Sequence, residues 1–242
     1  METRVALQPA YVLHTRPFQN SSLLIDFFTY DYGRVRAIAR GARREKSRYR
    51  SLLQLFQPLL LSFSGRGEVK TVSGVETGMA AISLHNERLF SGLYLNELLT
   101  RLLQDHEEHT QLYKHYQQAL LALQGADSMQ MILRRFEMNL LGELGYGINL
   151  QEEIGSHAPI EPEQLYRFNP DIGFERWEDD ADSDNRLFRG SHLIDLRNLQ
   201  WSDSESAQSA KRLLRLALAT HLGDKPLASR SLFASRAKPR NP

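Results

Sequence analysis

The chain of 242 residues is 41% hydrophobic and 24% charged, a composition typical of a soluble globular protein with one large domain or a few small ones. It contains no cysteine, which excludes a disulfide framework, thiol catalysis and a thiolate zinc site. No run approaches the roughly 18 apolar residues of a membrane-spanning helix, and the first residues lack the pattern of a secretion signal, so we expect a cytoplasmic protein.

The formal net charge of +1 hides a strong segregation of charge along the chain. Residues 1–80 carry 12 basic and 6 acidic side chains, residues 81–204 carry 10 and 21, and residues 205–242 carry 8 and 2. Basic ends on either side of an acidic middle favour a surface that binds a polyanion over a uniformly solvated surface.

The first 80 residues alternate between apolar and polar side chains in short runs separated by turn residues, which is typical of β-strands. Strands are predicted at 22–28, 33–40, 58–65 and 67–76. In the second run the apolar and basic side chains fall on opposite faces: Val35, Ala37 and Ala39 against Arg34, Arg36 and Arg40. Several short strands without a long helix indicate a small barrel or sandwich, and an oligonucleotide-binding (OB) barrel is one of the few folds of this size.

From about residue 83 the spacing of apolar residues becomes helical, with Ser83 as the candidate N-cap. Helices are predicted from there through Leu102, over 107–123, from near Ser128 to Leu144, and over 205–222. Residues 150–200 are rich in Asp, Glu, Pro and Gly and poor in periodicity. Within them, residues 174–186 are predicted to form an acidic, solvated loop.

The first candidate site is the stretch 33–50, where eight basic side chains accompany one acid, Glu45. Lys/Arg clusters on a barrel face track phosphates, and nearby tyrosines can stack on bases. With one acid in the stretch we expect these cations to be unpaired within the protein, and the alternative is a solvated loop without a ligand. Since no donor and acceptor set for base readout is present, binding is predicted to be independent of sequence. The basic residues are Arg34, Arg36, Arg40, Arg43, Arg44, Lys46, Arg48 and Arg50, and the tyrosines are Tyr30, Tyr32 and Tyr49.

A second candidate lies on the last predicted helix, where Lys211, Arg212 and Arg215 share one side. They are interpreted either as a second nucleic-acid contact or as a solvated helix face.

A third candidate is the segment LRRFEMNLLGELGYG at 133–147. The apolar spacing predicts that Leu133, Phe136 and Leu140 lie in the core. Arg134 and Arg135 leave that face, and they are predicted to be surface arginines that could sit beside an apolar groove.

Signals for catalysis are weak. His106 and His109 miss the spacing of a helical zinc pair, and His115 does not repair it. No nucleophile elbow, P-loop or dinucleotide-binding glycine pattern occurs, and Asp179 and Asp180 fall in the predicted solvated loop. We therefore predict that the protein is not an enzyme and uses no metal or other cofactor.

Five segments, taken in order, resemble the RecO family of bacterial DNA repair and recombination mediators: GRVRAIARGAR, SGRGEVKTV, SGLYLNELLTRLL, LRRFEMNLLGELGYGINL and GDKPLASRSLF. The resemblance runs from about residue 9 to residue 234 and weakens across 151–205. It implies an α+β multidomain protein with an N-terminal OB-fold barrel, an α-helical domain and a small irregular insertion. The corresponding ranges are 1–80 for the OB domain, 81–150 for the first part of the helical domain, 151–204 for the insertion, and 205–242 for the last helix and basic tail.

Many members of the family carry four zinc-binding cysteines in the insertion. This sequence has none there, and His157 alone cannot replace them. We therefore expect an insertion that is zinc-finger-like in position but free of metal, held by packing around Leu165, Tyr166, Phe168 and Phe174.

The resemblance also implies the function. RecO-like proteins bind single- and double-stranded DNA, anneal complementary strands, contact the single-stranded DNA-binding protein SSB, and with RecR help RecA replace SSB on gapped DNA. It implies DNA at the basic stretch and the last helix, the acidic SSB tail at Arg134 and Arg135, and a nucleoid-associated cytoplasmic protein of the RecFOR pathway. The alternative is a sequence-independent RNA-binding OB-fold protein.

Overall fold

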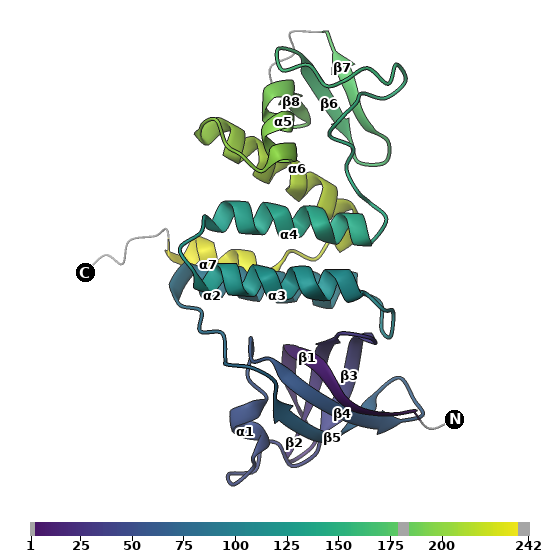
Figure 1. The fold of residues 1–242 in the computed structure, drawn as a ribbon, viewed down its shortest axis with the longest axis vertical. Coiled ribbons are helices and arrows are strands. Elements are labelled where there is room, and N and C mark those ends of the chain that lie inside the picture. Colours follow the sequence, from purple (N-terminus) through teal and green to yellow (C-terminus); the bar gives the residue numbers. More distant parts are fainter. Residues whose placement is uncertain (1–2, 179–183, 237–242) are drawn as a thin grey trace, which may run out of the picture. The chain divides into compact units, whose positions relative to one another are not determined.

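Five strands close into a barrel in the computed structural model, which describes residues 3–178 and 184–236 (Figure 1). The order around the barrel is β1-β2-β3-β5-β4, with β3 and β5 parallel and the other neighbours antiparallel. This is a small barrel of the OB type, and helices follow it, so the predicted fold class is confirmed. The strands are β1 (Thr3–Phe18), β2 (Ser22–Thr29), β3 (Gly33–Ala39), β4 (Leu59–Gly65) and β5 (Lys70–Thr77).

The two-residue repeat of the strands determines what fills the barrel. On β3 the apolar side chains are buried inside and the arginines lie on the outer face, as predicted: Val35, Ala37 and Ala39 against Arg34 and Arg36. Sequence reasoning did not delimit β1. Irregular steps between Val5 and Gln8 and between Val12 and His14 bend this long strand, so that it pairs with both β2 and β4.

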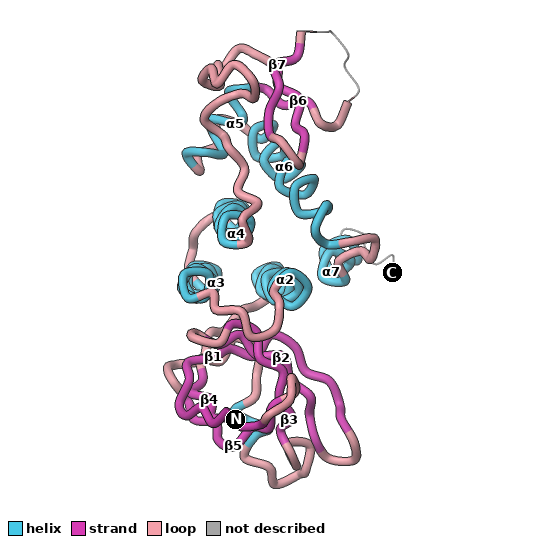
Figure 2. Tube along the Cα trace, turned by 90° about the vertical axis from the view of Figure 1, so that its right-hand side faces the viewer, coloured by secondary structure: helices cyan, strands magenta, loops and turns pink. Residues whose placement is uncertain are grey.

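Three longer helices complete the first of two compact units, whose described residues are 3–126 and 226–236. α2 packs on β1 and lies beside α3 and α7 (Figure 2). These helices are α2 (Asn86–Leu102), α3 (Thr110–Gln124) and α7 (Ala228–Arg236), while α1 (Tyr49–Leu52) is one turn between β3 and β4. No helix in the described part of the chain is long and apolar enough to cross a membrane.

The start of α2 differs from the prediction. His85, not Ser83, occupies the N-cap position. Ile82 and Leu84 are buried, and the Ile82 amide donates to the Phe56 carbonyl at 3.3 Å. These contacts keep the chain extended past the serine, so the helix begins later than the local sequence suggested.

A buried polar residue and an aromatic cluster join α2 and α3 to the barrel. The Asn96 amide donates to the Leu13 carbonyl at 3.0 Å, and its oxygen accepts from the Tyr116 hydroxyl at 2.6 Å. Rings from the barrel and α3 pack around it with centroids 5.2 to 5.9 Å apart: Tyr11 and Phe28 against Tyr113 and Tyr116. The helices therefore cover one part of the outer face of β1 and β2.

The C-terminal helix α7 is fixed to α2 by a carboxylate at its first turn. Glu97 accepts hydrogen bonds from the Ala228 and Ser229 amides, both at 2.8 Å, and from the Ser229 hydroxyl at 2.5 Å. Burial disfavours ionisation of Glu97, but these hydrogen bonds and the charge of Arg101 outweigh it and lower the pKa of the carboxyl. A negative charge here also complements the positive end of the helix dipole.

The second unit, described at residues 127–178 and 184–225, combines three helices there with a small antiparallel sheet in the order β7-β6-β8. α4 packs on α6, and α6 packs on α5. The Asp203 side chain caps α6 by accepting from the Ser206 amide at 2.7 Å. The elements are α4 (Met129–Glu143), β6 (Leu165–Asn169), β7 (Gly173–Trp177), β8 (Leu187–Arg189), α5 (Gly190–Asn198) and α6 (Ser204–Leu222).

The structure of the insertion differs from the prediction at Leu165 and at residues 174–177, and it adds Phe188 to the predicted core. Three of the predicted core residues are buried and a fourth ring joins them: Tyr166, Phe168 and Phe174 with Phe188. Leu165 is 37% exposed, because the strand repeat puts it on the opposite face of β6 from Tyr166. Residues 174–177 belong to β7 and not to a solvated loop, and Asp179 and Asp180 lie outside the described residues.

Ion pairs reinforce this aromatic core. Arg176 on β7 contacts Glu153 and Glu161, each at 3.2 Å. The Ser156 hydroxyl donates to Glu153 at 2.5 Å and, with Arg176, lowers the pKa of that carboxyl despite its desolvation. Ion pairs and a hydrogen bond thus attach the segment before the sheet to β7.

We predict that Glu97→Gln destabilises the protein at neutral pH by about 1–2 kcal/mol, because a charged acceptor of three hydrogen bonds becomes neutral. The folded pKa of Glu97 lies below its ordinary value of 4.5, so its contribution is complete above that value and disappears as the pH falls through the folded pKa. Thermal unfolding of both proteins at pH 7 and near pH 3 measures this difference. Glu87→Gln, an exposed change on the same helix, is the control; an equal Tm loss at both pH values would contradict the prediction.

Candidate nucleic-acid interface

Six exposed cations lie together at the end of β3 and in the connection to β4. The group, called the basic loop below, consists of Arg40, Arg43, Arg44, Lys46, Arg48 and Arg50. None of the six forms an ion pair with an acid among the residues that the structure describes. Glycine at position 41 adopts a φ of +68°, which turns the chain out of the strand.

The basic loop is attached to the barrel at both ends. Ala42 is buried in the barrel core, and the Arg43 amide donates to the Ser21 carbonyl at 2.8 Å. At the other end Leu53 is buried and Tyr49 packs against the same core. The cations are therefore held close to the barrel by apolar contacts that leave their charged groups in solvent.

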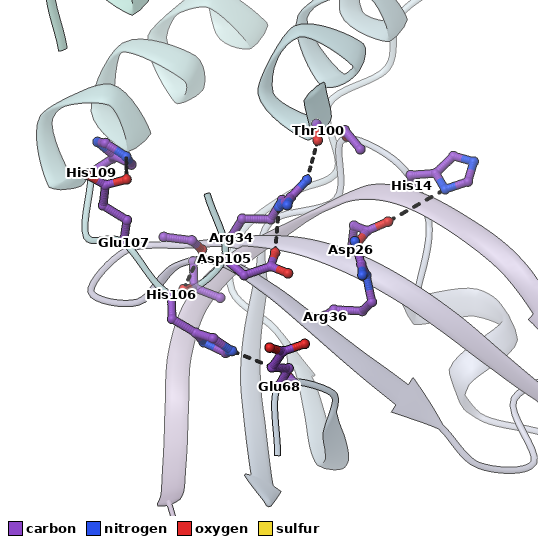
Figure 3. Close-up of polar contacts among 12 residues, drawn as sticks. His14, Asp26, Arg34, Arg36, Glu68, Thr100, Asp105, His106, Glu107 and His109 are labelled. Carbon is purple, nitrogen blue, oxygen red and sulfur yellow. Dashed lines mark hydrogen bonds and ion pairs between the residues drawn. The ribbon is translucent and has the colours of Figure 1, made fainter. Parts of the chain in front are cut away.

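Arg34 and Arg36, in contrast, are paired on the outer face of β3 (Figure 3). Arg34 Nε contacts Asp105 at 2.7 Å and the Arg34 guanidinium also donates to the Thr100 carbonyl. Arg36 Nε contacts Asp26 at 2.8 Å, a hydrogen bond that raises the pKa of Arg36. The expectation of unpaired cations is wrong for these two, because their partners come from other elements and not from the stretch itself.

The tyrosines near the stretch differ in their availability for stacking. Tyr30 is half-buried against Tyr113, at 5.4 Å between ring centroids, and Tyr49 is half-buried on the barrel core. Tyr32 is 37% exposed, although one edge contacts Phe63. Of the three predicted stacking rings, two are thus engaged within the protein.

The cations of the last long helix also divide into two kinds. Lys211 and Arg215 on α6 are exposed. Arg212 donates to the Leu187 carbonyl at 2.6 Å and lies 4.5 Å from the centre of the Phe188 ring. Arg212 therefore connects α6 to the small sheet, and its position is determined by the fold of the second unit.

The arginine pair on α4 is split in the same way. Arg135 is exposed, as predicted. Arg134 is buried, and its Nη2 donates to Glu137 at 2.8 Å, so its predicted surface position is wrong. The partner lies three residues further along the helix, on the same face, where an acid readily neutralises an arginine.

Two of the histidines singled out by their spacing contact other groups of the protein, His106 a distant residue and His109 a neighbouring one. The His106 ring lies 3.2 Å from the Glu68 carbonyl, and His109 is buried with Nε2 3.7 Å from Glu107. The same connection crosses Gly33, where a Cβ would come within 1.6 Å of the Glu107 carbonyl oxygen. Within residues 3–178 and 184–236, no group of three or more metal-ligating side chains is found.

The sequence matches the family described as Recombination protein O N terminal over residues 1–79 and the family described as Recombination protein O C terminal over residues 86–231. The chain belongs to the RecO family. Similar relatives named DNA repair protein RecO include one from Coxiella burnetii, 43% identical over 96% of this chain and all of the relative. Others come from Pseudomonas putida, 46% identical over 95% and 97% of the two chains, and Escherichia coli, 43% identical over 93% of each.

Two acids on the basic face of this RecO-family barrel were missed by sequence reasoning: Asp26 and Asp105. Asp26 carried a usable signal, since it interrupts the apolar run SLLIDFF on a strand that is buried along most of its length. A carboxylate in that setting requires a cation or several donors. Asp105 carried no comparable signal, because it follows a helix in an ordinary polar connection.

The insertion is predicted to bind no zinc, because it offers no thiolate and the Glu153 carboxylate is already paired with Arg176 and Ser156. Elemental analysis of protein purified without chelator measures the metal content. A near-stoichiometric amount of zinc would contradict the prediction.

Proposed function

We propose that this protein is a non-enzymatic DNA repair and recombination mediator that binds single- and double-stranded DNA and anneals complementary strands. The observation that carries the proposal is the basic loop on an OB-type barrel of a RecO-family chain: six exposed cations, none of which pairs with an acid in the part of the chain that the structure describes. Such a surface attracts phosphates whatever the base sequence. Bases of a strand held by its phosphates remain free to pair.

Annealing requires that the charge of two strands be reduced at the same time. The two units each present exposed cations: the basic loop in the first and Lys211 with Arg215 in the second. We assign one strand to each surface. The protein then lowers the repulsion between the strands without making or breaking a bond.

The third part of the proposal is contact with the acidic C-terminal tail of SSB at α4. Arg135 is exposed and supplies a charge-assisted hydrogen bond to a carboxylate of the tail. Arg134 was predicted for the same site, but it is buried and held by Glu137, so the contact is assigned to Arg135. Cooperation with RecR in loading RecA, and action at the nucleoid in the cytoplasm, are proposed from family membership alone.

Replacing Arg43, Arg44 and Lys46 together by Ala tests the DNA site. Contact with about six phosphates of a single strand gives a log–log salt slope near −4, so affinity falls by roughly two to three orders of magnitude between about 50 and 200 mM salt. The triple variant should flatten that slope by about two units and slow annealing in parallel. Fluorescence anisotropy with labelled oligothymidine measures the slope.

The matched control removes three exposed cations of the second unit, Arg189, Arg197 and Lys225, and should leave the slope close to that of the wild type. A folded loop variant with the wild-type slope would show that the basic loop is only solvated. Tighter binding of RNA than of DNA would favour an RNA-binding protein instead.

Arg135→Ala should weaken binding of an SSB-tail peptide by about tenfold, because one charge-assisted hydrogen bond to a carboxylate is lost. DNA affinity at fixed salt should change little, since the basic loop is intact. Calorimetry with the peptide and anisotropy with DNA give the two values. Arg197→Ala, a change of an exposed arginine elsewhere in the unit, is the control. Equal weakening of peptide and DNA binding would contradict the assignment of the SSB tail to α4.

A further inference from the structure

The outer face of the barrel carries a row of three polar side chains on neighbouring strands. In the strand register His14 on β1 lies opposite Asp26 on β2, and Asp26 lies opposite Arg36 on β3. Asp26 Oδ1 is 2.8 Å from Arg36 Nε, and its Oδ2 is 3.8 Å from His14 Nδ1 (Figure 3). Asp26 is 6% exposed, so this carboxylate depends on its neighbours for neutralisation.

Arg36 is placed where a phosphate could reach it, but its charge is already compensated. Its side chain is 31% exposed, and within the described residues only its Nε has a partner. Asp26 supplies the main opposing charge, and Asp105 and Glu68 add to it. Arg40, at the end of the same strand, has no acid beside it among the described residues and belongs to the basic loop.

We propose that Asp26 withholds Arg36 from nucleic acid, so that a single strand follows the basic loop and leaves the barrel wall at Arg40. A cation that is already neutralised by a carboxylate adds little positive charge to offset a phosphate, so it displaces few of the counterions condensed on the nucleic acid. Recruiting Arg36 to a phosphate would also weaken the neutralisation of the buried Asp26, which is costly. The affinity of the barrel for DNA is therefore lower than it would be if Arg36 were free to bind a phosphate.

Arg34 is withheld by the same means and more completely. Its side chain is 15% exposed, and it is held by the Thr100 carbonyl in addition to Asp105. Loss of the acid alone leaves Arg34 hydrogen-bonded to Thr100 in the last turn of α2. The releasable cation on the barrel wall is thus Arg36, and Asp26 is the residue that controls it.

This inference rests on the proposed DNA binding. It also predicts that a substitution tightens DNA binding, which the basic loop alone does not predict. Asp26→Asn preserves the shape of the side chain and frees the charge of Arg36. One further phosphate contact steepens the salt slope by about 0.7, which corresponds to about fivefold tighter binding near 0.1 M salt. Anisotropy with labelled oligothymidine, across a salt series, measures both quantities.

The double variant Asp26→Asn/Arg36→Gln tests whether Arg36 is held away from DNA by Asp26 or contacts a phosphate in the wild type. It removes the pair without changing the net charge, so it should bind with the wild-type slope. A slope flatter by about 0.7 would mean that Arg36 contacts a phosphate in the wild type, and would overturn the inference. Asp31→Asn, an exposed acid in the β2–β3 turn, is the control for charge alone. Equal tightening in this control and in Asp26→Asn would also overturn it.

The wild-type protein provides a second test that does not require a substitution at a buried site. In arginine side-chain NMR spectra, the Nε–H signal of Arg36 should stay in place when oligothymidine is added, while signals of the basic loop shift. Movement of the Arg36 signal together with the loop signals would overturn the inference. If the loop variant has a flatter slope but Asp26→Asn binds with the affinity and slope of the wild type, DNA binding stands and the inference fails. A loop variant with the wild-type slope would instead remove the proposed site.

Discussion

A charged side chain that leaves water must find an opposite charge or several hydrogen-bond partners, and this constraint decides the role of each arginine in the protein. Arg36 neutralises the buried Asp26, Arg134 neutralises Glu137 on α4, and Arg176 holds the segment before the small sheet. These side chains have positions determined by the fold. The exposed cations that have no acid beside them among the described residues are the ones available to a ligand, and most of those on the barrel gather in the basic loop.

The parts of the fold that could be predicted are those with a local cause. The alternation on β3 is set by neighbouring residues, and the structure reproduces it. The later start of α2 depends on Ile82 bonding to Phe56, a contact between segments that sequence patterns do not connect. The same limit applies to the candidate site, since Arg36 lies 10 residues from its acid and Arg34 lies 71 residues from its own. Counting charges in a short window cannot detect such partners.

Aromatic packing and ion pairs hold the described part of the insertion together. The burial of Tyr166, Phe168, Phe174 and Phe188 gives the small sheet an apolar centre. Arg176 and Arg212 then attach that sheet to the preceding segment and to α6. The strands went unpredicted because each is short and the acidic residues between β7 and β8 dominate the composition. Alternation within LYRF was nevertheless a correct signal for two of the buried rings.

The acidic middle of the chain does more than balance the basic ends. Asp105, Glu137, Glu153 and Glu161 all come from residues 81–204, and each neutralises an arginine that the fold requires. One of these arginines, Arg34, belongs to the basic N-terminal segment, so the segregation seen in the sequence is partly removed when the first unit folds. Asp26 acts from within the basic segment itself. The charge presented to a polyanion is thus set by which arginines lack an acid in the folded protein, and not by the net charge of the stretch.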